Sequence, residues 1–168
     1  MSLDSDIALL ARVKLFEGFN PDHLRLLAFG AEARTLGQGT RVYRQGSLSD
    51  GGYVIVRGNV DLISGLNDSI IASHGPGSLI GEMALITSTE HAASAIATEH
   101  TEVLKLPRPL FRRMLSEYPE LAGLLHGRIS NSVAEFMTRL ETIRGKLEHA
   151  SDLERRRARD RAEGVSLT

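Results

Sequence analysis

The sequence predicts a mainly β fold with helices at both ends of the chain. Short runs of β-branched and other apolar residues, separated by glycine-rich turns, fill the stretch from about residue 32 to residue 106. Strands at such short spacing are typical of a sandwich or a barrel-like roll. Apolar residues at intervals of three and four, the spacing of an amphipathic helix, precede and follow this stretch.

Two short helices are expected before the strands. The first lies within "DSDIALLARVKLF", where an aspartate is the candidate N-terminal cap. The second begins after Asn20, whose side chain can cap it. Pro21 suits the first helical position, because its φ is already fixed at a helical value.

Three stretches give local detail inside the β region. "YVIVRGNVDLI" indicates a β-hairpin with Gly58 in its turn, because glycine tolerates a positive φ. Two more strands, "HAASAIAT" and "TEVLKL", are predicted after the short stretch "GEMAL". These strands complete the β region before the chain turns helical again.

The last third of the chain predicts a short helix, "RPLFRRMLSEY", and a longer one that begins near Pro119. Apolar residues in the longer helix alternate by four and three, which is a heptad seam over about three repeats. The seam comprises Ile129, Val133, Phe136, Leu140, Ile143, Leu147 and Ala150. We expect it to hold a homodimer; the alternative is an apolar stripe that packs within one chain.

The C-terminal tail holds five arginines between residues 155 and 161. Such a run can contact nucleic acid or an acidic partner, or it can be the solvated, fraying end of a helix. The acidic residues among the arginines favour the second interpretation. The expected organisation is therefore a roll with its short helices (1–118), a dimerisation helix (119–160) and a flexible tail (161–168).

Composition and net charge exclude several kinds of partner and site. The net charge of −1 provides no overall field toward nucleic acid or an acidic membrane. The absence of cysteine excludes disulfides, iron–sulfur clusters, thiolate zinc sites and a cysteine nucleophile. The chain begins without a leader-like segment, and no stretch approaches the roughly 18 apolar residues of a membrane span. We expect a cytoplasmic protein with no membrane partner.

One stretch, "GSLIGEMALITSTEHAASAIATEH", has the features of a small-anion pocket. Gly81 lets the backbone approach a ligand closely, because no side chain intervenes. Backbone N–H groups after Gly81 can point at an anion such as a sugar phosphate. Glu82 offers a carboxylate to a ligand hydroxyl; alternatively, it only stabilises a helix N-terminus by a few tenths of a kcal/mol.

Four stretches in order, "LFEGFNPDHLRLLA", "YVIVRGNVDL", "GPGSLIGEMALI" and "VLKLPRPLFRRML", resemble the cyclic-nucleotide-binding domain. This domain occurs in the catabolite activator protein, the regulatory subunits of protein kinase A and cyclic-nucleotide-gated channels. The resemblance covers residues 8 to about 147. It implies a double-stranded antiparallel β-roll, jelly-roll-like, over residues 32–106, with N-terminal helices and a long C-terminal helix. It also implies cAMP or cGMP as the ligand, without a metal.

The resemblance implies which residues meet the phosphate and ribose: Gly81, Glu82, Met83, Ala84, His91 and Ala92. The family places an arginine in "PR(S/A)A", nine residues after the glutamate. This chain has His91 at that position, preceded by Glu90 in place of the proline. Imidazole makes at most one hydrogen bond where guanidinium makes two, and it is only partly charged near neutral pH. We therefore expect cyclic nucleotide binding to be weak or lost.

Several alternatives stay open around this position. Glu90 either holds His91 protonated or repels a phosphate. Arg41, Arg44 and Arg57 are substitute cations if one of them points inward, although each is more readily solvated. His74, His91 and His100 match no metal-ligand spacing, so no metal is expected. Phe136 and Met137 are candidates to cover the base of a nucleotide.

The sequence thus predicts a stand-alone regulatory module of this family that signals by movement of its C-terminal helices to an unidentified protein partner. Only 18 residues follow Ala150 (168 − 150), too few for a helix-turn-helix, so no sequence-specific DNA binding is expected. A degenerate, non-binding dimerisation protein is the main alternative, and a transcriptional regulator is a weaker one. No nucleophile–base pair emerges, so an enzyme is not expected.

Overall fold

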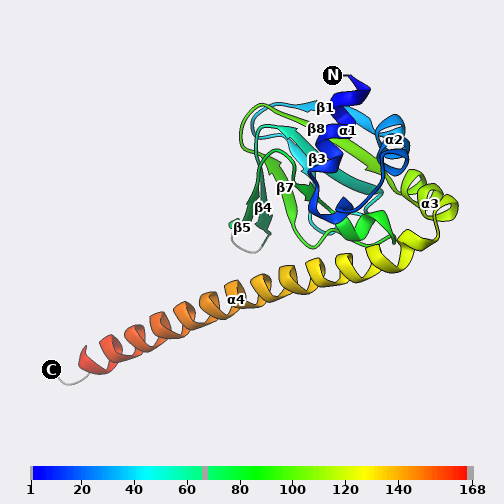
Figure 1. Cartoon of the computed structure of the whole chain (residues 1–168). Coiled ribbons are helices and arrows are strands. Elements are labelled where there is room, and N and C mark those ends of the chain that lie inside the picture. The colour runs from blue at the N-terminus through cyan, green and yellow to red at the C-terminus, as the bar shows by residue number, and fades with distance from the viewer. Residues whose placement is uncertain (1, 66–67, 166–168) are drawn as a thin grey trace. The chain divides into compact units, whose positions relative to one another are not determined.

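The computed structural model describes residues 2–65 and 68–165. The chain divides into two compact units, Met1–Val133 and Ala134–Thr168. The first unit contains two four-stranded sheets together with the shorter helices (Figure 1). The second unit consists of most of one long helix, α4 (Glu120–Val165).

The two sheets are antiparallel throughout. The first sheet has the order β1-β8-β3-β6, and the second has the order β2-β7-β4-β5. The strands of the first sheet are β1 (Glu32–Leu36), β8 (Thr101–Pro107), β3 (Gly51–Arg57) and β6 (Leu79–Ile80). The strands of the second are β2 (Arg41–Tyr43), β7 (Ser94–Ala97), β4 (Val60–Ser64) and β5 (Ser69–His74). This arrangement confirms the antiparallel β-roll with flanking helices.

The predicted hairpin around Gly58 is wrong. Strands β3 and β4 lie in different sheets: β3 pairs with β6 and β8, and β4 pairs with β5 and β7. Gly58 has a φ of 92°, and a Cβ there would lie 2.6 Å from the carbonyl oxygen of His100. The glycine therefore carries the chain from one sheet to the other past the β7–β8 turn. A hairpin and a crossing between two sheets have the same sequence pattern, two alternating strands around a glycine, so the pattern does not separate them.

Short helices flank the roll as expected: α1 (Leu3–Ala11), the 3-10 turn η1 (Lys14–Phe16) and α2 (Pro21–Gly30) come before it, and α3 (Arg108–Glu117) follows it. Asn20 caps α2, because its side chain accepts a hydrogen bond from the His23 amide at 3.0 Å, and Pro21 opens the helix. The cap of α1 is Ser2 rather than the predicted aspartate.

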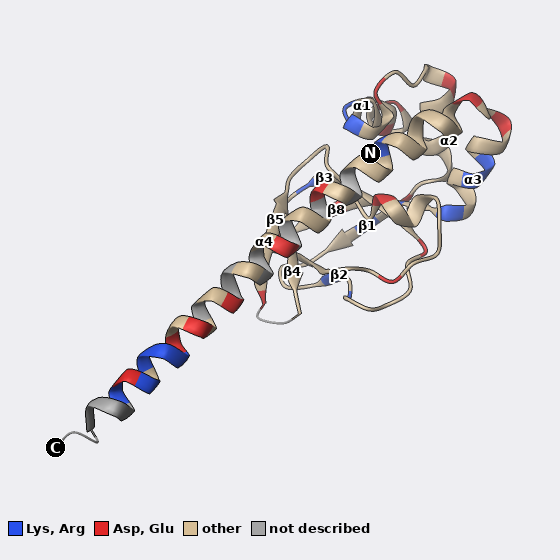
Figure 2. Cartoon of the chain, turned by 90° about the horizontal axis from the view of Figure 1, so that it is seen from below, with Lys and Arg blue, Asp and Glu red and all other residues tan. Residues whose placement is uncertain are grey.

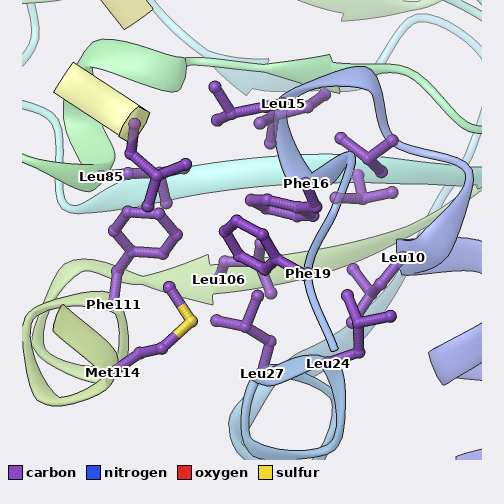
Figure 3. Packing of buried hydrophobic residues seen from close by; sticks show 14 of the residues in the cluster. Leu10, Leu15, Phe16, Phe19, Leu24, Leu27, Leu85, Leu106, Phe111 and Met114 are labelled. Atoms are coloured by element: carbon purple, nitrogen blue, oxygen red, sulfur yellow. The ribbon is translucent and has the colours of Figure 1, made fainter. Parts of the chain in front are cut away.

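The helices pack on the outer face of the first sheet and form the main hydrophobic core. Leu104 and Leu106 face this core because side chains alternate between the two faces of a strand. Figure 3 shows Phe16, Phe19 and Phe111 in this core. The ring centroids of Phe16 and Phe111 are 6.2 Å apart. Leu85 lies in the same cluster. The core therefore links α3 to the 3-10 turn η2 (Glu82–Leu85).

The first turns of α4 belong to this core. Leu121, Leu125 and Ile129 are buried in it, and Arg128 donates hydrogen bonds to the carbonyl oxygens of Leu15 (2.8 Å) and Glu17 (2.7 Å). The placement of Ile129 in a dimer seam is thus wrong: its side chain is fully buried by its own chain. At this end of α4, the apolar stripe packs within the chain.

The rest of α4 forms the second unit. The other predicted seam side chains, of Val133, Phe136, Leu140, Ile143, Leu147 and Ala150, lie outside the described part of the structure. Figure 2 shows basic and acidic residues interspersed in the last described turns of α4. Among the described residues, no helix has the length and apolarity that a bilayer crossing requires.

Candidate functional site

The predicted anion turn begins at Gly81, directly after β6. Gly81 has a φ of 75° and a ψ of 38°, the left-handed conformation, and it is the N-terminal cap of η2. A Cβ at Gly81 would make only ordinary contacts, 3.5 Å from the Gly51 carbonyl oxygen and 3.7 Å from the Cα of Gly52. Glycine is therefore needed for the backbone conformation rather than for space.

The η2 turn directs its apolar side chains toward the helical core. Leu85 is fully buried, Ala84 is nearly so, and Met83 packs against the core cluster. The Ala84 amide already donates to the carbonyl oxygen of Gly81 at 3.1 Å. Met83 and Ala84 thus hold the turn in place, and Gly81 with Glu82 forms the part nearest the aromatic side chains described below.

Arg108, the first residue of α3, ties three segments together. Its Nε donates to the Ala84 carbonyl oxygen at 2.9 Å, and its Nη2 donates to the carbonyl oxygen of Ser49 at 2.6 Å and to the Ser49 hydroxyl at 3.0 Å. Its backbone amide donates to the carbonyl oxygen of Asp50 at 2.9 Å. One side chain therefore connects η2, the loop before β3 and the start of α3.

An aromatic stack stands beside Gly81. Tyr43 pairs with Ala95 in the second sheet, and its ring stacks on the His91 imidazole, with centroids 3.7 Å apart and an interplanar angle of 8°. The Cε1 atom of Tyr43 lies 4.0 Å from the Cβ position of Gly81. The ring of Tyr53, from the first sheet, is 6.0 Å away. The stack thus lies between the two sheets, next to the turn expected to meet the phosphate.

The phenol of Tyr43 stays neutral over the whole physiological range. Burial raises its pKa most, followed by the negative charge of Glu82 and by Tyr53. The effect of Glu82 on this pKa shows that the carboxylate lies close enough to act on the phenol electrostatically. Glu82 therefore lies near the Tyr43 ring.

His91 is held in place by its backbone. Its amide donates to the Ser47 carbonyl oxygen at 2.9 Å, and its own carbonyl accepts from the Gly46 amide at 2.9 Å. Burial lowers the pKa of the imidazole, and the charge of Asp50 raises it by a smaller amount. Asp50, and not Glu90, is the carboxylate that raises the pKa of His91, and burial outweighs it, so the structure does not support the interpretation that Glu90 keeps His91 protonated.

The remaining predicted site residues whose side chains the structure describes are exposed. Ala92 is exposed. The candidate base cap Met137 is 47% exposed in the second unit, and the side chain of Phe136 is outside the described residues. The side chains of Arg41, Arg44 and Arg57 are exposed as well, and Arg57 pairs with Glu102 at 3.6 Å. Within the described residues, no group of three or more potential ligands is placed to hold a metal.

Sequence reasoning missed the ion pair between the buried Lys105 and the exposed Asp50. The ammonium of Lys105 lies 2.6 Å from the carboxylate of Asp50, and Lys105 is only 8% exposed. The sequence signal was present in "TEVLKL", where a strict two-residue alternation places Lys105 on the same face as buried Val103. Tyr43 carried no comparable signal, because its contacts with Gly81 and His91 are distant in sequence.

Comparison with known proteins agrees with this geometry. A family model described as the cyclic nucleotide-binding domain matches residues 33–118, which is more than half of the chain. The chain is 32% identical over 144 residues to the Cyclic AMP receptor protein of Thermus thermophilus; the match covers 81% of this chain and 67% of that protein. It is 29% identical over 140 residues to the cAMP-dependent protein kinase regulatory subunit of Eremothecium gossypii. That match covers 83% of this chain and 30% of the subunit.

A solved structure extends the comparison. The cyclic nucleotide-binding-like protein from Brucella abortus is 44% identical, with a TM-score of 0.60. The match covers 67% of this chain and 99% of that chain. The two-sheet roll and the matching family model agree with one another. The chain belongs to the cyclic nucleotide-binding domain family.

Proposed function

We propose that this chain is a regulatory module in which cyclic nucleotide binding, to cAMP or cGMP, is weak or lost. The observation that carries the proposal is the stack of Tyr43 on His91 beside Gly81. A neutral, stacked imidazole stands where the family pattern has an arginine, so the phosphate loses a permanent charge and one of two parallel hydrogen bonds. Retention of Gly81 and Glu82 supports residual binding.

The same contacts suggest how a ligand at η2 acts on the helices. Arg108 joins the Ala84 carbonyl oxygen to the start of α3, and Leu85 packs in the same core as Phe111. Suppose that η2 has two positions and that the ligand binds one of them more tightly. The ligand then shifts the population toward the conformer with that position, to an extent set by the difference between the two affinities. We propose that this shift moves α3 and the first turns of α4, residues 120–133, and so alters a surface for a protein partner.

Backbone hydrogen exchange tests this route. In the His91→Arg variant, which we expect to bind, saturating cAMP should slow exchange in both η2 and α3. Adding Arg108→Met should preserve the slowing in η2 and remove most of it in α3, because the hydrogen bond to Ala84 is lost. Arg112→Met, at an exposed position of the same helix, is the control and should leave both effects intact. Equal slowing in α3 with and without Arg108 would show that another contact transmits the signal.

Dimerisation through α4 remains a proposal that rests on the heptad spacing. Burial of apolar seam residues contributes about 1.5–3 kcal/mol per side chain, enough to sustain a dimer. Leu140→Glu should therefore give a monomer by light scattering. Met137, which is exposed and outside the predicted seam, provides a matched control: Met137→Glu should leave the mass of the dimer unchanged. A dimer that survives Leu140→Glu would place the interface elsewhere.

A second candidate function is a non-binding interaction protein. The observation that favours it is the close approach of the Tyr43 ring to the Cβ position of Gly81, which brings an aromatic ring to the place where the phosphate is expected. In this case neither the wild type nor the His91→Arg variant would bind a nucleotide. For both candidates we propose a non-catalytic, cytoplasmic protein without sequence-specific DNA binding.

A further inference from the structure

Lys105 is a buried cation on the inner face of the first sheet. Its neighbours along β8, Leu104 and Leu106, face the helical core, so alternation turns Lys105 toward the space between the sheets. Directly across the ladder it pairs with Tyr53, which is 5% exposed and also absent from the helical core. Among the Lys and Arg side chains that the structure describes, that of Lys105 is the one that is buried.

The partner of Lys105 lies in a different environment. The side chain of Asp50 is 68% exposed, whereas that of Lys105 is 9% exposed. Lys105 lowers the pKa of Asp50 mainly through their hydrogen bond, so the carboxylate is ionised at neutral pH. The other acidic residue across the ladder, Glu32, is already paired with Arg34 at 3.2 Å. Asp50 is therefore the counter-ion that neutralises Lys105.

This pair lies next to the turn that begins η2. Asp50 directly precedes Gly51, whose carbonyl oxygen is 3.5 Å from the Cβ position of Gly81. The charge of Asp50 also acts on His91, and that of Lys105 acts on Tyr53. The ion pair, the aromatic stack and the glycine turn thus form one neighbourhood between the sheets.

The unequal exposure of the two partners determines which one can leave. A carboxylate on the rim is rehydrated when the pair separates, whereas a buried ammonium without a counter-ion carries a large desolvation penalty. Exchanging Asp50 for another anion therefore costs much less free energy than removing Asp50 and leaving Lys105 without a counter-ion. An ammonium binds phosphate as a point charge and needs no forked geometry.

We propose that Lys105 is the cation that receives the ligand's anionic group in this roll, and that Asp50 competes with the ligand for it. The ligand class is a phosphate ester, and the proposal rests on the proposed function insofar as that ester is a cyclic nucleotide. Binding is then an exchange of counter-ions, and the competing carboxylate keeps the affinity of the wild-type protein low. Near neutral pH this role belongs to Lys105 rather than to the neutral His91 or to the exposed arginines; position 91 adds a charge only when the imidazole is protonated or replaced by arginine.

Four proteins test the exchange: the wild type, Asp50→Asn, Lys105→Met and the double variant. Asparagine keeps an oxygen for Lys105 but removes the competing charge. Asp50→Asn should bind cAMP at least about tenfold more tightly than the wild type by calorimetry, as the removal of a charged competitor requires. Inorganic phosphate should also raise its melting temperature more than chloride does at equal ionic strength. Lys105→Met and the double variant should show neither effect.

The outcomes separate this proposal from the proposed function. If phosphate stabilises Asp50→Asn but no cyclic nucleotide binds it, Lys105 is an anion site and cyclic nucleotide binding is lost. If the double variant binds cAMP as tightly as Asp50→Asn, the role of Lys105 is overturned although the domain binds nucleotide. If Asp50→Asn equals the wild type with both probes, the exchange is overturned. If Lys105→Met does not fold, Lys105→Gln provides a second variant without the charge. Circular dichroism checks that each variant is folded.

Discussion

Replacing His91 with arginine is expected to raise the affinity for cAMP by roughly ten- to a hundred-fold. A charge-assisted hydrogen bond to phosphate contributes about 1.5–3 kcal/mol, which corresponds to this range of affinity. The planar guanidinium can take the place of the imidazole against the Tyr43 ring, because arginine also stacks on aromatic faces. Calorimetric titration of the variant and the wild type measures the difference.

The control for this substitution is His91→Gln, which keeps a polar side chain without the charge and should give no gain. The pH dependence adds a second readout. Because burial lowers the pKa of His91, protonation of the native imidazole occurs below its usual value of about 6.5. Wild-type affinity should therefore rise only as the pH falls below 6.5, whereas the affinity of the arginine variant should not follow this titration. No gain from His91→Arg would favour the non-binding alternative.

The titration of His91 also affects stability, with a definite sign. A histidine whose folded pKa lies below its unfolded value favours the folded state when it is neutral. This contribution is fully present above about pH 6.5 and is lost as the pH falls through the lowered pKa. The pair of Asp50 and Lys105 acts in a lower window, because the lowered pKa of Asp50 stabilises the fold above about pH 3.8 and loses this effect in more acidic solution.

The largest loss of stability is expected from Phe111→Ala. Phe111 is fully buried in the core between the helices and the first sheet (Figure 3), and its ring centroid lies 6.2 Å from that of Phe16. Removing a buried phenylalanine side chain leaves a cavity and typically lowers the free energy of unfolding by about 3–5 kcal/mol. Urea unfolding measures the loss. Because Leu85 shares this core, the position of η2 should also become less defined.

Phe29 provides the matched control for Phe111. Its side chain is 81% exposed on α2, so Phe29→Ala should change the free energy of unfolding by no more than about 0.5 kcal/mol. Similar losses for the two substitutions would contradict the assignment of Phe111 to the core that connects η2 to α3.

Local signals in the sequence predicted local structure correctly. Asn20 followed by Pro21 predicts the start of α2, because capping and a fixed φ depend on neighbouring residues only. A turn at Gly81 is also present, but its glycine serves a left-handed backbone with a φ of 75° rather than the close approach that the sequence suggested. The hairpin at Gly58 failed because the choice between pairing with the next strand and crossing to the other sheet depends on β8 and the β7–β8 turn, more than 40 residues away.

The chemistry of the site depended on contacts that sequence spacing does not contain. The position of His91 was found by counting from Glu82, but its neutral, stacked state follows from Tyr43 and from burial. Lys105 is separated from Asp50 by 55 residues, and the two meet only because β8 pairs with β3. The alternation of "TEVLKL" marks Lys105 as inward-facing, and this is the signal that identifies such a residue without a structure.

The most direct test of the central claim is a calorimetric titration of the unmodified protein with cAMP and cGMP at pH 7.5. His91 is neutral and stacked on Tyr43, Lys105 is neutralised by Asp50, and the nearby Arg34 is paired with Glu32. Each of these described groups is therefore neutral or already paired when a phosphate arrives. We predict no saturable heat, or only weak binding with a Kd of about 1 mM. Tight binding, with a Kd below about 1 μM, would contradict the account.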